Sequence, residues 1–167
     1  MKSRSFIFLI ALCFAGCGYQ IGEIKPTAMR SVKTLAIPTF INKTYEARVE
    51  VLVADTVIKQ FQQDGTYPIV SDKTADAILI ATITKFERRS IRSALNNVIA
   101  TSEFDLHMEV DYKVVDRISG RILLHSKAVG DTPFFSTPDL QTDERQAIPL
   151  AAQRMAVQMV SYVSEGW

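Results

Sequence analysis

The chain has 167 residues, and its 19 lysines and arginines nearly balance its 18 aspartates and glutamates, giving a formal net charge of +1. This balance argues against a general nucleic-acid-binding protein, which carries a basic excess. The length suits one domain around one hydrophobic core. The sequence shows no internal repeat and no Gly-rich phosphate-binding loop.

The first 16 residues have the pattern of a secretory signal segment. Lys2 and Arg4 precede a continuous apolar run from Phe6 to Phe14, and two small residues follow. The run is shorter than the roughly 20 apolar residues that span a bilayer, and it has the length of a signal-peptide core. We predict that residues 1–16 are removed; the alternative is a buried N-terminal helix of the folded domain.

Cys17 stands directly after the small residues Ala15 and Gly16. This arrangement resembles the bacterial lipoprotein signal, in which cleavage precedes the cysteine and the cysteine then carries several acyl chains, palmitate among them. Several chains anchor a protein stably where one binds only marginally. In lipoproteins, Gly18 rather than Asp after the cysteine favours the outer membrane. Ordinary signal cleavage would instead leave Cys17 as a free thiol.

Cleavage before Cys17 would also remove Cys13, so Cys17 would be the only cysteine left. An internal disulfide is then not expected. Residues 17–30 contain Gly22 and Pro26 and little periodicity, which predicts a tether between the lipid and a single domain over residues 31–167.

The domain begins with a predicted strand over residues 31–40, with Pro38 ending it or marking a sheet edge. A helix is predicted over residues 47–61, with Thr44 able to cap it and Asp64-Gly65 ending the helical segment. Its apolar residues are four apart, as on one helical face: Val49, Val53, Val57 and Phe61.

Three strands are predicted next, over residues 77–87, 101–115 and 121–129, with a hairpin loop at residues 116–120. Residues 101–115 alternate between apolar side chains, from Phe104 to Val114, and charged ones, from Glu103 to Lys113. Such alternation indicates an antiparallel sheet with one buried face and one wet face. Residues 131–139 are expected to form a loop. A second helix is predicted over residues 141–163, in which Pro149 implies a kink or a late start.

This order of elements predicts an α+β fold: a two-layer sandwich with a mostly antiparallel four-stranded sheet covered by two helices.

Catalytic and metal sites find little support in the sequence. His107 and His125 both fall in predicted strands, and no nucleophile motif accompanies them. A stripe of charged residues could offer metal ligands, but its members are spaced about 6.5–7 Å apart along a strand, too far to converge on one ion without bending. We interpret the stripe as the solvated face of a sheet; it consists of Glu103, Asp105, His107, Glu109 and Asp111. No enzyme activity, metal or cofactor is expected.

A basic cluster lies where the strand over residues 77–87 is expected to pass into a loop. It contains Arg88, Arg89 and Arg92, and aliphatic residues follow it up to Ala100. Arginine's planar guanidinium binds phosphate oxygens in pairs, so the cluster is a candidate site for an amphipathic anion such as a lipid with phosphates on its head group. Alternatively, these arginines pair with Glu87 or Glu103 in a solvated loop. A second basic pair, Arg117 and Arg121, flanks the hairpin and is interpreted as an ordinary charged turn.

Together these features resemble the lipopolysaccharide-assembly lipoprotein family (LptE-like). The resemblance rests on Cys17-Gly18-Tyr19, on Val32 to Phe61 (VKTLAIPTFINKTYEARVEVLVADTVIKQF), on Tyr67 to Arg88 (YPIVSDKTADAILIATITKFER) and on the C-terminal helix from Arg145.

The resemblance implies a lipoprotein at the periplasmic side of the outer membrane, anchored through acylated Cys17. Such a protein plugs a large LptD-like β-barrel, helps it assemble and contacts lipopolysaccharide; it binds no nucleic acid, uses no cofactor and breaks no bond. The opening strand, turn and helix also resemble periplasmic adaptor lipoproteins that regulate cell-wall synthases or build secretion channels. The three successive strands favour the transport role over that alternative.

Overall fold

The computed structural model describes residues 25–92, 102–136 and 139–166. The predicted signal segment and the lipidation site at Cys17 lie outside the described residues. Beginning with a short 3-10 helix, the elements are η2 (Thr27–Met29), β1 (Leu35–Ala36), β2 (Ile41–Asn42), α2 (Val49–Asp64), β3 (Ala77–Arg92), β4 (Ser102–Asp116), β5 (Ile122–Ser136) and α3 (Leu140–Ser164).

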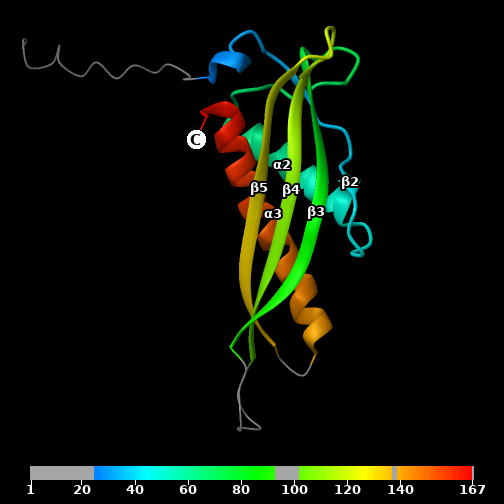
Figure 1. Ribbon diagram of the computed structural model, residues 1–167, viewed down its shortest axis with the longest axis vertical. Helices are drawn as coiled ribbons and strands as arrows, with labels where there is room; N and C mark the ends of the chain where they lie inside the picture. Colours follow the sequence, from blue (N-terminus) through cyan, green and yellow to red (C-terminus); the bar gives the residue numbers. More distant parts are fainter. Residues whose placement is uncertain (1–24, 93–101, 137–138, 167) are drawn as a thin grey trace, which may run out of the picture.

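Three long strands dominate the sheet (Figure 1). β4 pairs antiparallel with β3 on one side and with β5 on the other. β1 and β2 pair parallel with β3 at two successive places along its outer edge. The predicted strand over residues 31–40 is therefore wrong in detail, because two short strands replace it. Pro38 lies between them and has no N–H to continue a ladder.

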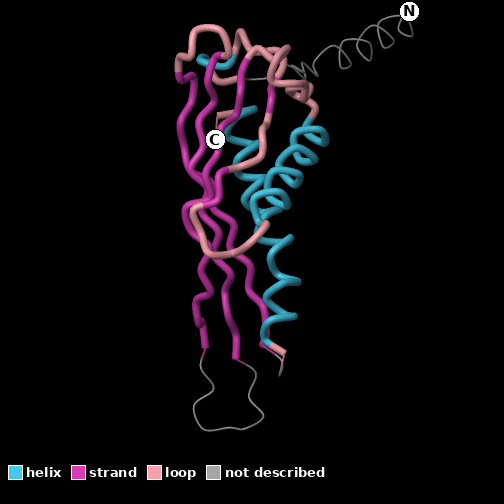
Figure 2. The backbone as a smooth tube through the Cα atoms, turned by 90° about the vertical axis from the view of Figure 1, so that its right-hand side faces the viewer, coloured by secondary structure: helices cyan, strands magenta, loops and turns pink. Residues whose placement is uncertain are grey.

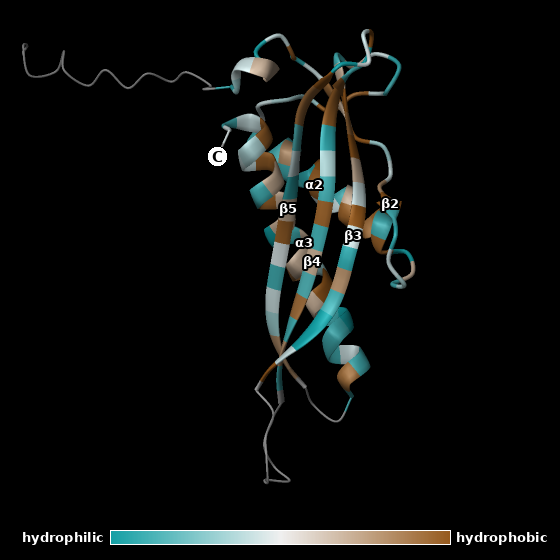
Figure 3. Ribbon diagram, viewed as in Figure 1, coloured by the Kyte–Doolittle hydropathy of each residue, from teal (hydrophilic) through white to brown (hydrophobic). Residues whose placement is uncertain are grey.

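Both helices lie on the same face of the sheet, so the molecule has two layers (Figure 2). The helices cover the face of the sheet on which the apolar side chains of β4 lie. Leu106, Met108 and Val110 are fully buried there. Val53 of α2 and Met155 of α3 belong to the same core. The predicted two-layer, mostly antiparallel α+β sandwich is confirmed, but the sheet of the described residues has five strands rather than the predicted four, because β1 and β2 both pair with β3. Teal and brown alternate along the long strands in Figure 3, as this pattern requires.

The strands extend further than the sequence predicted. β3 runs to Arg92 and β5 runs to Ser136, so the predicted loops at residues 88–92 and 131–136 are wrong. Pairing with β4 over nearly its whole length holds both segments extended. Pro133 fits into β5 because an edge strand does not need that N–H.

The helices also correct the predictions. Thr44 does not cap α2, because its backbone N–H and its hydroxyl donate to Asn42 Oδ1 at 2.8 and 2.7 Å in a local turn. Instead Arg48 precedes α2 in a left-handed conformation with φ 65°. α3 begins at Leu140, nine residues before Pro149, so a late helix start is excluded. None of the described helices combines the length and apolar character needed to cross a membrane.

Candidate functional site

The face of the sheet without helices is the most distinctive surface of the described chain, and we call it the open face. Every second side chain of β4 lies on the open face, between the residues that point into the core. These side chains are Glu103, Asp105, His107, Glu109, Asp111 and Lys113. They are partly buried rather than fully wet, and His107 is only 7% exposed. The expectation of a charged face is confirmed, but its central strand is shielded by side chains from both neighbours.

Ion pairs cross this face from strand to strand. Glu109 on β4 contacts Lys85 of β3 at 3.4 Å and Lys127 of β5 at 2.8 Å. The Lys127 hydrogen bond, aided by Lys85, lowers the pKa of the Glu109 carboxyl, and the same bond raises the pKa of Lys127. His125 Nε2 lies 3.0 Å from Asp111 Oδ1. The carboxylates therefore bind the three strands together.

A second group on the open face joins Asp105, His107 and Asp131. His107 Nδ1 lies 2.6 Å from Asp131 Oδ1. Burial raises the pKa of the Asp105 carboxyl, and the neighbouring charge of Asp131 raises it further. Within the described residues, no group of histidine, cysteine and carboxylate side chains has the arrangement of a metal site.

Two register shifts in β3, one before Arg88 and one between Ser90 and Arg92, decide on which face each candidate arginine lies. The register shifts between Ile83 and Lys85, so Thr84 is an extra residue on β3. Side chains on β3 exchange faces at this point, because strand residues alternate with a period of two. Arg88 consequently lies on the helix side, whereas Arg89 lies on the open face.

Arg88 is held by two groups. Its guanidinium donates to Glu144 Oε2 of α3 at 2.8 Å, and its Cζ lies 5.5 Å from the centre of the Phe104 ring. Phe104 in turn stacks on Phe134 with ring centroids 5.7 Å apart. Arg88 therefore ties the far end of the sheet to α3.

Arg89 is held less firmly, since it contacts Glu87 at 3.4 Å and both side chains are about half exposed. This contact agrees with the alternative in which the arginines pair with Glu87. Arg92 lies opposite Glu103 in the ladder between β3 and β4. The structure thus places the three arginines in a strand and does not gather Arg88 and Arg89 on one surface.

The second basic pair lies at the opposite end of the sheet. Arg117 donates through Nε to the Ala75 carbonyl at 2.6 Å, and the Arg121 carbonyl accepts from the Asp116 N–H at 2.9 Å. Both residues hold the hairpin between β4 and β5 in place. This agrees with their interpretation as a structural turn.

Sequence reasoning missed two features of this region. Asp131 belongs to the open face, but the sequence from Asp131 to Pro133 is typical of a loop. Glu144 pairs with Arg88 across 56 positions, and only the bulge at Thr84 brings the two to the same side. Neither feature leaves a local sequence signal.

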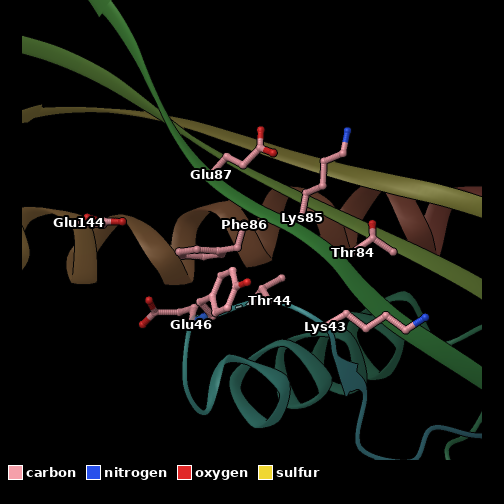
Figure 4. Close-up of a pocket in the computed structure, with 9 residues that line it drawn as sticks. Lys43, Thr44, Glu46, Thr84, Lys85, Phe86, Glu87 and Glu144 are labelled. Atoms are coloured by element: carbon pink, nitrogen blue, oxygen red, sulfur yellow. Dashed lines mark hydrogen bonds between the residues drawn. The ribbon is translucent and has the colours of Figure 1, made fainter.

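A groove lies beside β3 at the bulge (Figure 4). Its volume is about 440 Å³, and its walls come from residues 43–46, residues 84–87 and Glu144. Lys85 and Glu87 lie on one side of β3, and Phe86 points to the other side, toward the 43–46 segment (Figure 4).

Solved structures of very low sequence identity share this fold. A protein from Xanthomonas campestris aligns with a TM-score of 0.61 at 13% identity, over 79% of this chain and 83% of its own. A minor lipoprotein from Acinetobacter baumannii aligns with a TM-score of 0.53 at 13% identity, over 79% and 92%. A PelC dodecamer from Paraburkholderia phytofirmans aligns with a TM-score of 0.54 at 11% identity, over 79% and 89%. At such identities these likenesses establish the fold alone.

No curated protein matches the chain. The sequence profile of the lipopolysaccharide-assembly family (LptE) matches residues 32–163, which include nearly all of the described domain from the approach to β1 through α3. The chain therefore belongs to the lipopolysaccharide-assembly family.

Proposed function

We propose that this chain is an outer-membrane lipoprotein that occupies the lumen of a large β-barrel and assists the passage of lipopolysaccharide to the cell surface. It is anchored at the periplasmic side through acylated Cys17 and breaks no bond. Membership of the lipopolysaccharide-assembly family is the observation that carries the proposal.

The open face supports a place inside a barrel. Barrel lumens are polar, so a protein that fills one needs a polar surface. The open face is such a surface: Glu109 contacts both Lys85 and Lys127. His125 Nε2 and Asp111 Oδ1 add a polar contact at 3.0 Å.

The barrel partner is tested by affinity purification of the tagged protein from solubilised membranes. We expect a large LptD-like outer-membrane β-barrel to co-purify in constant ratio. Recovery of a peptidoglycan synthase or a secretion-channel component, with no barrel, would contradict the proposal and favour the adaptor role.

The anchor is tested by mass spectrometry of the mature N-terminus. We expect a chain that starts at Cys17 and carries acyl chains. An unmodified Cys17, or a chain that starts elsewhere, would refute the lipid anchor. Neither result would bear on the proposed interaction with the barrel.

We further propose that Arg88, Arg89 and Arg92 contact the phosphates of lipopolysaccharide. Arg89 offers the most accessible guanidinium of the first two, since Glu144 already holds Arg88. A photocrosslinking residue at each position should capture glycolipid, most strongly at position 89. Lys127 is the matched control, because it is an exposed cation on the same face that Glu109 neutralises. Equal capture at position 127, or no capture at the three arginines, would rule out this contact site.

A further inference from the structure

A second groove lies at the β5 edge of the sheet, between the last part of β5 and the first half of α3. Its volume is about 290 Å³. Most of its lining is apolar: Pro133, Phe134 and Phe135 come from β5, and Ala147 and Leu150 come from α3. Phe134 and Ala147 are buried, whereas Phe135 is 61% exposed and Leu150 is 52% exposed. The groove therefore joins buried apolar residues to two large apolar side chains that solvent still reaches.

One polar group in the lining lacks a partner. Thr132 lines the groove and is 2% exposed, and its hydroxyl forms no hydrogen bond among the described residues. A buried hydroxyl without a partner lowers stability, and such groups are rare in folded proteins. An oxygen atom of a ligand in the groove would supply the missing partner. A mostly apolar lining with a few placed polar groups is typical of small-molecule sites.

The edge of β5 beside this groove does not suit a peptide strand. The Val129 N–H donates to Gln158 Oε1 of α3 at 2.6 Å, and Arg154 donates to the Asp131 carbonyl. Pro133 has no N–H to offer. An extended peptide would therefore bury its own N–H and C=O groups here without the ladder partners that strand addition requires. A hydrocarbon chain carries no such groups, so the groove favours hydrocarbon over peptide.

The groove lies close to the arginine end of the sheet. Arg88, Leu106 and Thr132 are successive ladder partners across β3, β4 and β5, so the Cα atoms of Arg88 and Thr132 are about 10 Å apart at the usual strand spacing. Arg88 also contacts the Phe104 ring, which stacks on Phe134 of the groove. None of the described lining residues is a cation. Phosphate-binding groups and an apolar groove are thus separate but adjacent, as are the polar and apolar parts of a lipid.

We propose that this groove binds one acyl chain of the lipopolysaccharide whose phosphates meet the arginines. The carbonyl oxygen that joins this chain to the head group accepts a hydrogen bond from the Thr132 hydroxyl. The hydrocarbon then lies along Phe134, Phe135 and Leu150. This inference rests on the proposed contact with lipopolysaccharide and extends it from the phosphates to the hydrocarbon. It does not depend on the barrel partner.

Photocrosslinking in cells that make lipopolysaccharide tests the groove. A diazirine-bearing residue, which reacts with C–H bonds, replaces Leu150, and mass spectrometry identifies the captured lipid. Val51 of α2 gives the matched control, because it is an aliphatic helix residue that is 51% exposed and lies outside this groove. We expect glycolipid on position 150 and none on position 51.

The crosslinker at position 89 reports the head group separately, so the two proposals can fail independently. Capture at position 89 with none at position 150 would overturn the acyl-chain groove and leave the phosphate contact standing. A phospholipid on position 150, or equal capture at position 51, would also overturn the groove. No glycolipid at either position 89 or position 150 would contradict both proposals.

Retention of glycolipid by the full mature chain, purified in mild detergent, gives a second test. Leu150→Glu should reduce the glycolipid bound per chain by about tenfold, because it places a charge where hydrocarbon would lie. Val51→Glu should retain the wild-type amount. Thr132→Val should also reduce retention, whereas Thr132→Ser keeps the hydroxyl and should not. Urea denaturation of each variant separates loss of binding from loss of folding. Equal retention by folded Leu150→Glu and Val51→Glu, or wild-type retention by Thr132→Val, would contradict the proposed site.

Discussion

Replacing Gly130 with alanine tests the packing of the two layers most directly. Gly130 lies on the helix side of β5, opposite Met108 of β4. A Cβ placed on it would lie 2.0 Å from the Ala151 carbonyl oxygen and 2.9 Å from Met155 Cβ, both on α3. Backbone atoms cannot rotate away, so α3 must move outward as a body.

The size of the effect follows from that distance. Ordinary contact begins near 3.4 Å, so the helix must retreat by about 1.4 Å. A gap of about 0.5–1 Å between two packed atoms already removes a quarter to a half of their dispersion energy. Inserting an extra group into a packed core costs about 1–3 kcal/mol by itself. Ala151, Ala152 and Met155 are fully buried against the sheet and would lose contact together. We expect Gly130→Ala to lower the free energy of unfolding by about 3 kcal/mol or more.

Urea denaturation followed by far-UV circular dichroism measures this change. Gly120→Ala is the matched control, because its Cβ would meet nothing within 4 Å and only its positive φ of 70° opposes the change. That strain costs about 1–2 kcal/mol. A Gly130→Ala variant no less stable than Gly120→Ala would show that α3 does not pack on β5 as described.

Two further predictions concern polar groups. Thr132 is 2% exposed, and its hydroxyl has no hydrogen-bond partner among the described residues. The isosteric Thr132→Val should therefore leave stability unchanged or raise it by about 1 kcal/mol in the same urea assay. A clear loss of stability would contradict this assignment. Asp105 and Glu109 should respond to pH with opposite signs, which urea midpoints at neutral and acid pH can measure. The Asp105 carboxyl has a raised pKa, so its charge costs stability at neutral pH; Asp105→Asn should stabilise there, and the gain should vanish as pH falls through that pKa. The Glu109 carboxyl has a lowered pKa, so it stabilises above its unfolded pKa; Glu109→Gln should destabilise at neutral pH, and the loss should vanish as pH falls through the lowered pKa. Shifts of equal sign in both variants would contradict the assigned environments.

The layers of this fold could be predicted because their signals are local. Apolar residues occupy every second position of β4 and every fourth position of α2, so the sequence of each element indicates which of its sides is apolar. A sheet and a helix that each have one apolar side pack with those sides together. Gly65 ends its helical segment as expected, with φ 78° and its N–H bonded to the Phe61 carbonyl at 2.9 Å.

The candidate site could not be predicted in the same way. One extra residue in β3, at Thr84, moves the side chains from Lys85 to Ser90 to the face opposite the one that unbroken alternation predicts, and a second register shift before Arg92 reverses this change. A bulge has no sequence signature of its own. Arg88 and Arg89 look like one cluster in the sequence, but as neighbours in a strand they lie on opposite faces, and the bulge decides which of them faces α3. Asp131 was hidden for a related reason: tertiary pairing with β4 overrides the loop preference of the residues around Pro133.

The length of the sheet connects the anchor with the arginines. The short helix η2 and the beginning of β3 lie at one end of the molecule, and the end of β3 lies at the other (Figure 1). β3 has 16 residues, so its ends are roughly 50 Å apart at about 3.3 Å per residue. Residues 17–24 can extend at most about 28 Å, so the proposed lipid on Cys17 would keep the near end close to its membrane. The hydrocarbon core of a bilayer is only about 30 Å thick. A sheet of this length, anchored on the periplasmic side and seated in a barrel, would carry its arginine end across the thickness of the membrane toward the outer leaflet, which is the direction that lipopolysaccharide must travel.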